Sequence, residues 1–232
     1  MFSDESLELR RKLAYACRIL AANGHNDTIY GHVSHREAGA DTYWMKPSQM
    51  GMDEVTPDTM IRIDLDGRIV EGELPRHIEF PIHSEIYRAR PEVTCVVHTH
   101  PTHAVAFAAT GLPMRSISQE GPLFVPDVPR FTVTANLIRT RQEGEAIARI
   151  LGDAPACFLV YHGIVAADAT IEGTVIKAIS LEDACKKQLL AAAVNPNFQG
   201  VPTSEAETKR DTYPNKSFEH MWHYYCRRIG SL

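Results

Sequence analysis

The sequence predicts a single α/β domain, and three observations lead to that class. Residues 5–22 and 170–193 carry the apolar spacing and the length of two long helices. Two short apolar runs, 93–98 and 156–161, are typical of strands buried on both faces of a sheet. The 232 residues contain no repeat, low-complexity tract or clear linker, and a chain of this length can bury one large core.

Each element follows from local signals in the sequence. The expected strands cover 33–35, 42–45, 60–64, 68–70, 93–98, 123–125, 156–161 and 164–166. The expected helices cover 5–22, 78–89, 102–109, 140–151 and 170–193. Gly24 ends the first helix, Asp64-Leu65-Asp66-Gly67 predicts a hairpin turn, and Thr170 is the expected N-cap of the last helix.

Charge and hydropathy exclude several classes of partner. The formal net charge is −5, so the chain has no basic excess to neutralise nucleic-acid phosphates or an anionic membrane. No apolar run approaches the ~20 residues that a membrane span needs, and the acidic start of the chain shows no secretory signal. The five cysteines are scattered without a Cys-x-x-Cys pair, which is typical of buried thiols in a reducing compartment. We therefore expect a cytoplasmic protein.

Two histidines spaced by one residue, His98 and His100, end the apolar run 93–98 just before Pro101. Residues i and i+2 of a strand point to the same face, roughly 6.5–7 Å apart at ~3.3 Å rise per residue. Two imidazoles at that spacing can bind one metal ion through bonds of about 2.0–2.1 Å. A buried strand with two structural histidines explains the pair equally well, so a metal site needs further ligands.

Two other residues are candidates for those ligands. His162 ends the second apolar run beside Gly163, so the three imidazoles meet at one sheet edge if the two strands are neighbours. Glu79 lies before the first run, where Glu79 and His83 at i and i+4 share the inward face of the expected helix. An inward carboxylate needs a cation or hydrogen bonds to offset its burial. His83 alone is more typical of a core histidine or of a neighbour of the ligands.

The ordered set Glu79, His98-Thr-His100 and His162-Gly163, with Gly31-His-Val-Ser34 upstream, resembles the class II aldolase/adducin family. The resemblance covers about residues 5–195. It implies a three-layer α/β/α fold around a central, largely antiparallel sheet, and a homotetramer with active sites at subunit interfaces.

The resemblance also implies one divalent metal ion per subunit. Zinc, manganese, cobalt and iron all suit three imidazoles and one carboxylate. The implied ligands are Glu79, His98, His100 and His162, with Glu79 as ligand, acid/base or both. Some members of the family are cytoskeletal proteins without a metal site. Because this chain keeps all four positions, we expect an enzyme.

Three short motifs cradle the phosphate in the sugar-phosphate aldolases of the family: Gly-Asn-x-Ser, Thr-Gly after a Pro, and Ser-Ser before the glutamate. They correspond here to Gly31-His32-Val33-Ser34, Pro47-Ser48-Gln49-Met50-Gly51 and Arg76-His77. Small hydroxyl donors suit a phosphate, whereas the planar fork of an arginine suits a carboxylate. The expected substrate is therefore a small-molecule carboxylate. The expected substrate-binding residues are His32, Ser34, Ser48, Arg76 and His77.

Family members that decarboxylate dihydroxyphthalates or a hydroxy-methylpyridine dicarboxylate resemble this chain in carrying a basic pair where the aldolases carry serines. The resulting hypothesis is metal-dependent, non-oxidative decarboxylation of a hydroxylated aromatic carboxylic acid, a carboxy-lyase reaction with Glu79, Arg76 and His77 as catalytic residues. The alternative is an aldolase, epimerase or dehydratase acting on a sugar phosphate or hydroxy acid. A non-catalytic binding protein is a more remote alternative.

The chain is polar after Asn195-Pro196 and then becomes rich in aromatic residues. We expect residues 1–195 to form the catalytic domain and residues 196–232 a tail that packs at a subunit interface. In the aldolases of the family, aromatic residues of the tail and of a neighbouring subunit help to close the site. The candidates for that role here are Tyr213, Trp222, Tyr224 and Tyr225. A tail helix that packs these aromatics at a subunit interface is an equally good interpretation.

Overall fold

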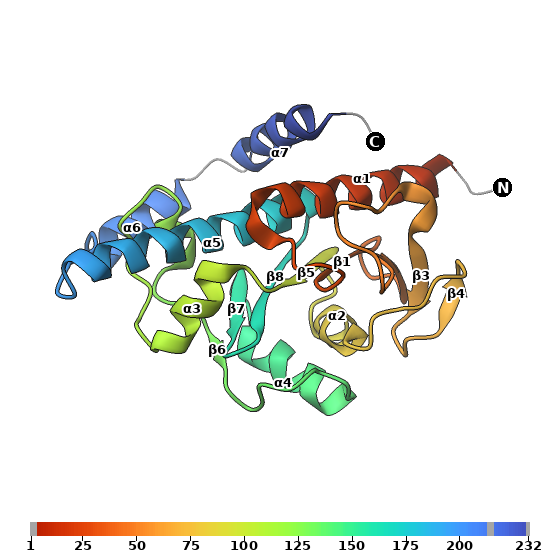
Figure 1. Ribbon diagram of the computed structural model, residues 1–232, viewed down its shortest axis with the longest axis horizontal. Helices are drawn as coiled ribbons and strands as arrows, with labels where there is room; N and C mark the ends of the chain where they lie inside the picture. The colour runs from red at the N-terminus through yellow and green to blue at the C-terminus, as the bar shows by residue number, and fades with distance from the viewer. Residues whose placement is uncertain (1–3, 213–215, 231–232) are drawn as a thin grey trace.

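One eight-stranded sheet forms the centre of the computed structural model, which describes residues 4–212 and 216–230 (Figure 1). The strands are β1 (His32–His35), β2 (Thr42–Met45), β3 (Ile61–Asp64), β4 (Ile69–Glu71), β5 (Cys95–Thr99), β6 (Arg130–Phe131), β7 (Ala156–Leu159) and β8 (Gly163–Asp168). Their order across the sheet is β4-β3-β2-β1-β5-β8-β7-β6. Every neighbouring pair is antiparallel except β6–β7. The predicted α/β fold with a largely antiparallel sheet is confirmed.

Helices cover both faces of this sheet. They are α1 (Asp4–Leu20), α2 (Phe80–Ala89), α3 (Thr102–Thr110), α4 (Arg141–Leu151), α5 (Ile171–Val194), α6 (Thr203–Asp211) and α7 (Lys216–Ile229). One core cluster joins α1, α3, α5 and α7 to the sheet, and a second joins α2 and α4 to its opposite face (Figure 1). None of the helices in the described parts of the chain is long and apolar enough to cross a membrane.

The alternation of side chains along β5 decides which face holds the chemistry. Val97 belongs to the core cluster under α1, α3 and α5, whereas Val96 belongs to the cluster under α2 and α4. Successive residues of a strand point to opposite faces, so His98 lies on the same face as Val96. In β1 the same parity places His32 on the α2 face, and His32 pairs with His98 across the β1–β5 ladder.

Several local predictions are confirmed. Asp64 Oδ1 accepts hydrogen bonds from the backbone N–H groups of Asp66 and Arg68 in the β3–β4 turn. Gly67 in that turn has a φ of 83°, which glycine adopts without steric cost. Thr170 caps α5, since its hydroxyl accepts a hydrogen bond from the Gly173 N–H at 3.0 Å.

The predicted strand at 123–125 is wrong. Residues Gly121–Phe124 form a short 3-10 turn instead, and the strand of this region is β6 at Arg130–Phe131. Pro122 and Pro126 flank the apolar residues 123–125. Neither proline can donate a hydrogen bond to a neighbouring strand, which explains the turn. Helix α2 also begins later than predicted, at Phe80, so that Glu79 precedes the helix.

The C-terminal tail packs against its own chain. Helix α7 lies along α1 and α5, and Trp222 is buried in the core cluster that those helices share. Tyr224 is half exposed, whereas Tyr213 lies outside the described residues. The placement of residues 196–232 at a subunit interface stays a prediction.

His25, just beyond α1, is completely enclosed, and its Nδ1 lies 2.8 Å from the Thr99 hydroxyl. Burial lowers the pKa of His25 to about 3 from an ordinary value of 6.5. Between those values the unfolded chain takes up a proton that the folded chain refuses, so stability falls as the pH falls through this window. The slope is up to ~1.4 kcal/mol per pH unit. In urea titrations at several pH values, His25→Gln should lose less stability on acidification than the parent protein; equal losses would contradict this assignment.

Candidate metal centre

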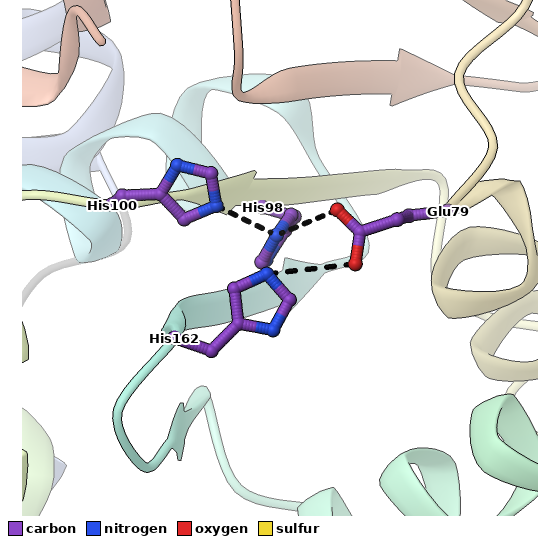
Figure 2. A group of neighbouring side chains, drawn as sticks. All are labelled: Glu79, His98, His100 and His162. Atoms are coloured by element: carbon purple, nitrogen blue, oxygen red, sulfur yellow. Dashed lines mark hydrogen bonds and ion pairs between the residues drawn. The ribbon is translucent and has the colours of Figure 1, made fainter. Parts of the chain in front are cut away.

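Four side chains converge beside the end of β5: Glu79, His98, His100 and His162 (Figure 2). His98 and His100 come from β5 and the residue that follows it, and His162 comes from the turn between β7 and β8. Glu79 immediately precedes α2. On one side β5 is adjacent to β8, with β7 beyond it. The turn between β7 and β8 therefore places His162 beside His98 and His100. The structure thus brings all four predicted ligands together.

The separations of the ligand atoms match a small coordination sphere. His98 Nε2 lies 3.2 Å from His100 Nε2 and 3.7 Å from Glu79 Oε2, and His162 Nε2 lies 3.5 Å from Glu79 Oε1. Atoms that bind one tetrahedral ion at about 2.0–2.1 Å are separated by roughly 3.3–3.4 Å. The three measured separations therefore agree with a shared ion.

Hydrogen bonds to the other ring nitrogens define where the protons lie. His98 Nδ1 donates to the Ile164 carbonyl at 2.9 Å, and His100 Nδ1 donates to Asp27 Oδ2 at 3.0 Å. Both partners only accept, so each neutral ring carries its proton on Nδ1 and a lone pair on Nε2. Two lone pairs then face each other at 3.2 Å, and His162 Nε2 is buried without a hydrogen-bond partner in the part of the chain that the structure describes. A divalent cation satisfies all three nitrogens, so these residues fit a metal ion.

The surroundings of His100 and Glu79 keep these two side chains in the protonation states that a metal requires. It lowers the pKa of His100 to about 4, with the neighbouring His98 as a further cause, so the ring is neutral near pH 7. Burial alone would raise the pKa of Glu79, but contacts with His162, His32 and His98 outweigh it and hold the pKa well below its usual value. Glu79 is thus an anion, and the ring of His100 is neutral.

Asp27, which the sequence analysis did not identify, orients His100 through the 3.0 Å contact to Nδ1. Residues that orient metal-binding histidines typically contribute 10–100-fold to metal affinity. We expect Asp27→Asn to raise the dissociation constant for zinc by about that factor, measured by competition with a chromophoric chelator. Asp153→Asn, which changes an exposed carboxylate in the turn after α4, is the control. Equal affinities for the two variants would rule out this role of Asp27.

Comparison with protein families assigns the chain to a family. The model of the class II aldolase and adducin N-terminal domain matches residues 11–189. The chain belongs to that family.

Relatives in the class II aldolase family include decarboxylases and aldolases. The chain is 29% identical over 239 residues to the 3,4-dihydroxyphthalate decarboxylase of Arthrobacter keyseri, covering 96% of this chain and 94% of the relative. It is 35% identical over 196 residues to the decarboxylase NovR of Streptomyces niveus, covering 83% and 73%. The structure of L-fuculose 1-phosphate aldolase from Glaciozyma antarctica superposes with a TM-score of 0.86 at 26% identity, covering 99% of this chain and 92% of that one.

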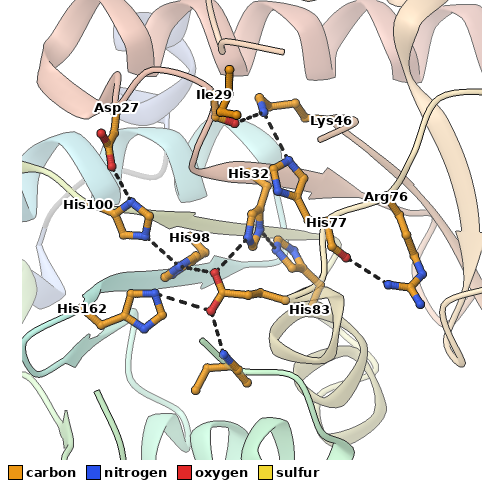
Figure 3. Close-up of polar contacts among 12 residues, drawn as sticks. Asp27, Ile29, His32, Lys46, Arg76, His77, His83, His98, His100 and His162 are labelled. Atoms are coloured by element: carbon orange, nitrogen blue, oxygen red, sulfur yellow. Dashed lines mark hydrogen bonds and ion pairs between the residues drawn. The ribbon is translucent and has the colours of Figure 1, made fainter. Parts of the chain in front are cut away.

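Two of the predicted substrate-binding residues lie beside the four ligands of this class II aldolase centre (Figure 3). The His32 ring lies 4.9 Å from the His98 ring and 4.4 Å from the His77 ring, between centroids. Lys46 lies behind His77, and its Nζ donates to the Ile29 and Pro47 carbonyls and contacts His77 Nε2 at 3.2 Å. Burial lowers the pKa of Lys46 to about 8, and burial followed by the Lys46 charge lowers that of His77 to about 3.

Two other predicted residues use their hydroxyl groups on the protein itself. Ser34 is fully buried, and its Oγ lies 2.6 Å from His83 Nδ1 and 2.7 Å from Tyr87 Oη. Ser48 Oγ donates to the Pro75 carbonyl at 3.1 Å. These serines occupy two of the three motif positions that cradle phosphate in the aldolases of the family, and their hydroxyl groups already have protein partners.

Arg76 extends away from the four ligands (Figure 3). Its Nε donates to the Gly67 carbonyl at 2.6 Å, and its guanidinium lies 4.2 Å from the centre of the Phe80 ring. These contacts attach the β3–β4 turn to the start of α2. The predicted role of Arg76 as a carboxylate anchor therefore has no geometric support within this chain and stays a prediction.

Replacement of Arg76 distinguishes the two roles. From the contacts in the chain, we expect Arg76→Ala to lower the free energy of unfolding by about 1 kcal/mol, through loss of a hydrogen bond and a cation–π contact. We expect KM for the substrate to change less than about twofold, because the guanidinium does not face the ligands. Urea unfolding and steady-state kinetics measure the two effects. A tenfold rise in KM at unchanged stability would restore the carboxylate-binding role.

Proposed function

We propose that this protein is a divalent-metal-dependent, non-oxidative decarboxylase of a hydroxylated aromatic carboxylic acid. The observation that carries the proposal is the chemistry of the wall beside Glu79, His98, His100 and His162. That wall presents the imidazoles of His32 and His77, while the serine hydroxyls that would suit a phosphate are bound to protein atoms. The names of the relatives from Arthrobacter keyseri and Streptomyces niveus support the same class of reaction.

The proposed reaction replaces a carboxylate on an aromatic ring carbon by a proton and releases carbon dioxide. A divalent ion of zinc, manganese, cobalt or iron would supply a Lewis acid at this site. Glu79, His98, His100 and His162 are its proposed ligands. Because its pKa is held low and its Oε1 accepts the Ile138 N–H at 2.8 Å, Glu79 serves as an anionic ligand in this proposal, and the proton that replaces the carboxylate comes from solvent.

The other side chains bind and enclose the substrate. His32 and His77 are buried and offer flat faces to an aromatic ring. Lys46, enclosed among carbonyl groups behind His77, adds a positive charge that favours an anionic substrate on this side of the centre. Glu79 and His98 are buried and His100 and His162 are partly exposed, so water has restricted access to the centre, which strengthens each of these electrostatic effects.

A pair of assays tests the proposed function. Metal-loaded protein is incubated with 3,4-dihydroxyphthalate and other hydroxylated aromatic carboxylates, and the release of carbon dioxide is measured. In parallel it is incubated with dihydroxyacetone phosphate and an aldehyde. We expect carbon dioxide in the first assay and no carbon–carbon bond formation in the second. Aldol product without carbon dioxide would overturn the proposal in favour of an aldolase, the activity named for the Glaciozyma antarctica structure.

A further inference from the structure

A buried chain of hydrogen bonds connects the wall of the centre to the interior of α2. His32 Nδ1 lies 2.6 Å from His83 Nε2 (Figure 3). His83 Nδ1 lies 2.6 Å from Ser34 Oγ. Ser34 Oγ lies 2.7 Å from Tyr87 Oη, which in turn lies 3.3 Å from the Thr94 carbonyl oxygen. His32, His83, Ser34 and Tyr87 are all buried, so water does not compete for these bonds.

The far end of this chain sets the direction of every bond, because a carbonyl oxygen only accepts. Tyr87 donates to Thr94 O, so Tyr87 accepts from Ser34, and Ser34 accepts from His83 Nδ1–H. His83 Nε2 then holds a lone pair and accepts from His32 Nδ1–H. A neutral imidazole has one N–H, so His32 Nε2 is left with a lone pair.

The opposite direction satisfies fewer groups. It would put the proton of His32 on Nε2, where the nearest charged acceptor, Glu79 Oε2, is 3.9 Å away and beyond hydrogen-bond range. It would also turn a lone pair of Tyr87 toward the Thr94 carbonyl at 3.3 Å. His32 Nε2 is buried without a hydrogen-bond partner among the described residues, and it faces the ligands of the centre.

We propose that His32 presents the Nε2 lone pair to the substrate and accepts a hydrogen bond from a substrate hydroxyl group. His83, Ser34 and Tyr87 are positioning residues that hold His32 in this tautomer. The choice of a hydroxyl on an aromatic ring rests on the proposed function, whereas the tautomer does not. The proposal replaces the sequence-based expectation that His32 binds a carboxylate, because a lone pair repels an anion and attracts an O–H.

Nitrogen NMR of the histidine rings tests the tautomer directly. The protein is labelled with nitrogen-15, loaded with diamagnetic zinc and studied near neutral pH, and the signals of His32 are identified by their loss in His32→Asn. We expect the proton on Nδ1 of His32, and a mixture of tautomers in Tyr87→Phe, which removes the terminal donor. Tyr43→Phe is the matched control, because Tyr43 is an equally buried tyrosine. Its hydroxyl contacts Ser84, which is not part of the hydrogen-bond series from His32 to Thr94. A proton on Nε2 of His32 in the parent protein would overturn the proposal.

Ligand binding tests the consequence for specificity. Affinities for 2-hydroxybenzoate and 2-methoxybenzoate are compared, since a methyl group in the second replaces the hydroxyl hydrogen that would form the hydrogen bond to His32. We expect the parent protein and Tyr43→Phe to prefer the hydroxyl compound by at least about tenfold, as for a hydrogen bond to a buried group. We expect the preference to fall to about threefold or less in Tyr87→Phe. An unchanged preference in Tyr87→Phe would contradict the role of the positioning residues. If neither compound binds, the proposed function fails, while NMR still decides the tautomer.

Discussion

Replacing His98 by alanine is expected to abolish stoichiometric metal binding and to lower kcat/KM by at least about 10³-fold, because a Lewis acid typically contributes several kcal/mol to such reactions. His98 is fully enclosed, and its Nε2 lies between His100 Nε2 at 3.2 Å and Glu79 Oε2 at 3.7 Å. Its loss removes the ligand that contacts both His100 and Glu79. Metal content is measured by mass spectrometry of the purified variant, and turnover by release of carbon dioxide.

The control for this experiment is His223→Ala, which removes an exposed histidine of α7. The control should keep one metal ion per chain and full activity. Retention of a full equivalent of metal by His98→Ala would show that the ion binds elsewhere in the protein.

Gly163→Ala is expected to lower both the stability of the protein and its affinity for the metal, although glycine has no side chain that could bind a metal. A Cβ at this position would lie 2.5 Å from the Thr99 carbonyl oxygen, 2.7 Å from His100 Cδ2 and 3.3 Å from His98 Cε1. The backbone of β5 and the rings of His98 and His100 would have to move, although pairing within the sheet holds β5 in place. Overpacking of this kind costs roughly 2–4 kcal/mol. We also expect zinc affinity to fall at least about tenfold, because two ligands of one ion are displaced.

Urea unfolding with and without zinc measures both effects of Gly163→Ala. The matched control is Gly39→Ala, where a Cβ has no heavy atom within 4 Å and the positive φ of 74° alone costs about 1 kcal/mol. If the two variants lost equal stability and both kept their zinc affinity, the close approach of β8 to β5 would not be required by the centre.

The three histidines of the centre were predictable because each marks a boundary that the sequence displays. His98-Thr99-His100 stands where a run of apolar β-formers meets a proline, and His162 stands where another run meets Gly163. Glu79 was a candidate from its i, i+4 spacing with His83, and the family resemblance added its role as a ligand and the antiparallel sheet, which spacing alone does not give. The three-layer arrangement follows once β5 and β7 are buried on both faces.

The surroundings of the centre were less predictable, because they depend on contacts between distant segments. Asp27 meets His100 only through the pairing of β1 with β5, and no local motif connects residues 73 positions apart. The direction of the Arg76 side chain is decided by its contacts with Gly67 and Phe80. Residue spacing in the sequence cannot show whether an arginine contacts such protein groups or a substrate carboxylate. Ser34 was expected to contact substrate, but it is buried under α2, where its hydroxyl group forms a hydrogen bond with His83.

The central claim is that Glu79, His98, His100 and His162 hold one divalent ion, and anomalous X-ray diffraction tests it most directly. Crystals of protein loaded with zinc or manganese are measured on both sides of the absorption edge of the metal. The account predicts one strong anomalous peak per chain, about 2.0–2.2 Å from the three Nε2 atoms and a Glu79 oxygen. A fully loaded protein whose anomalous peak lies away from these four side chains would contradict it.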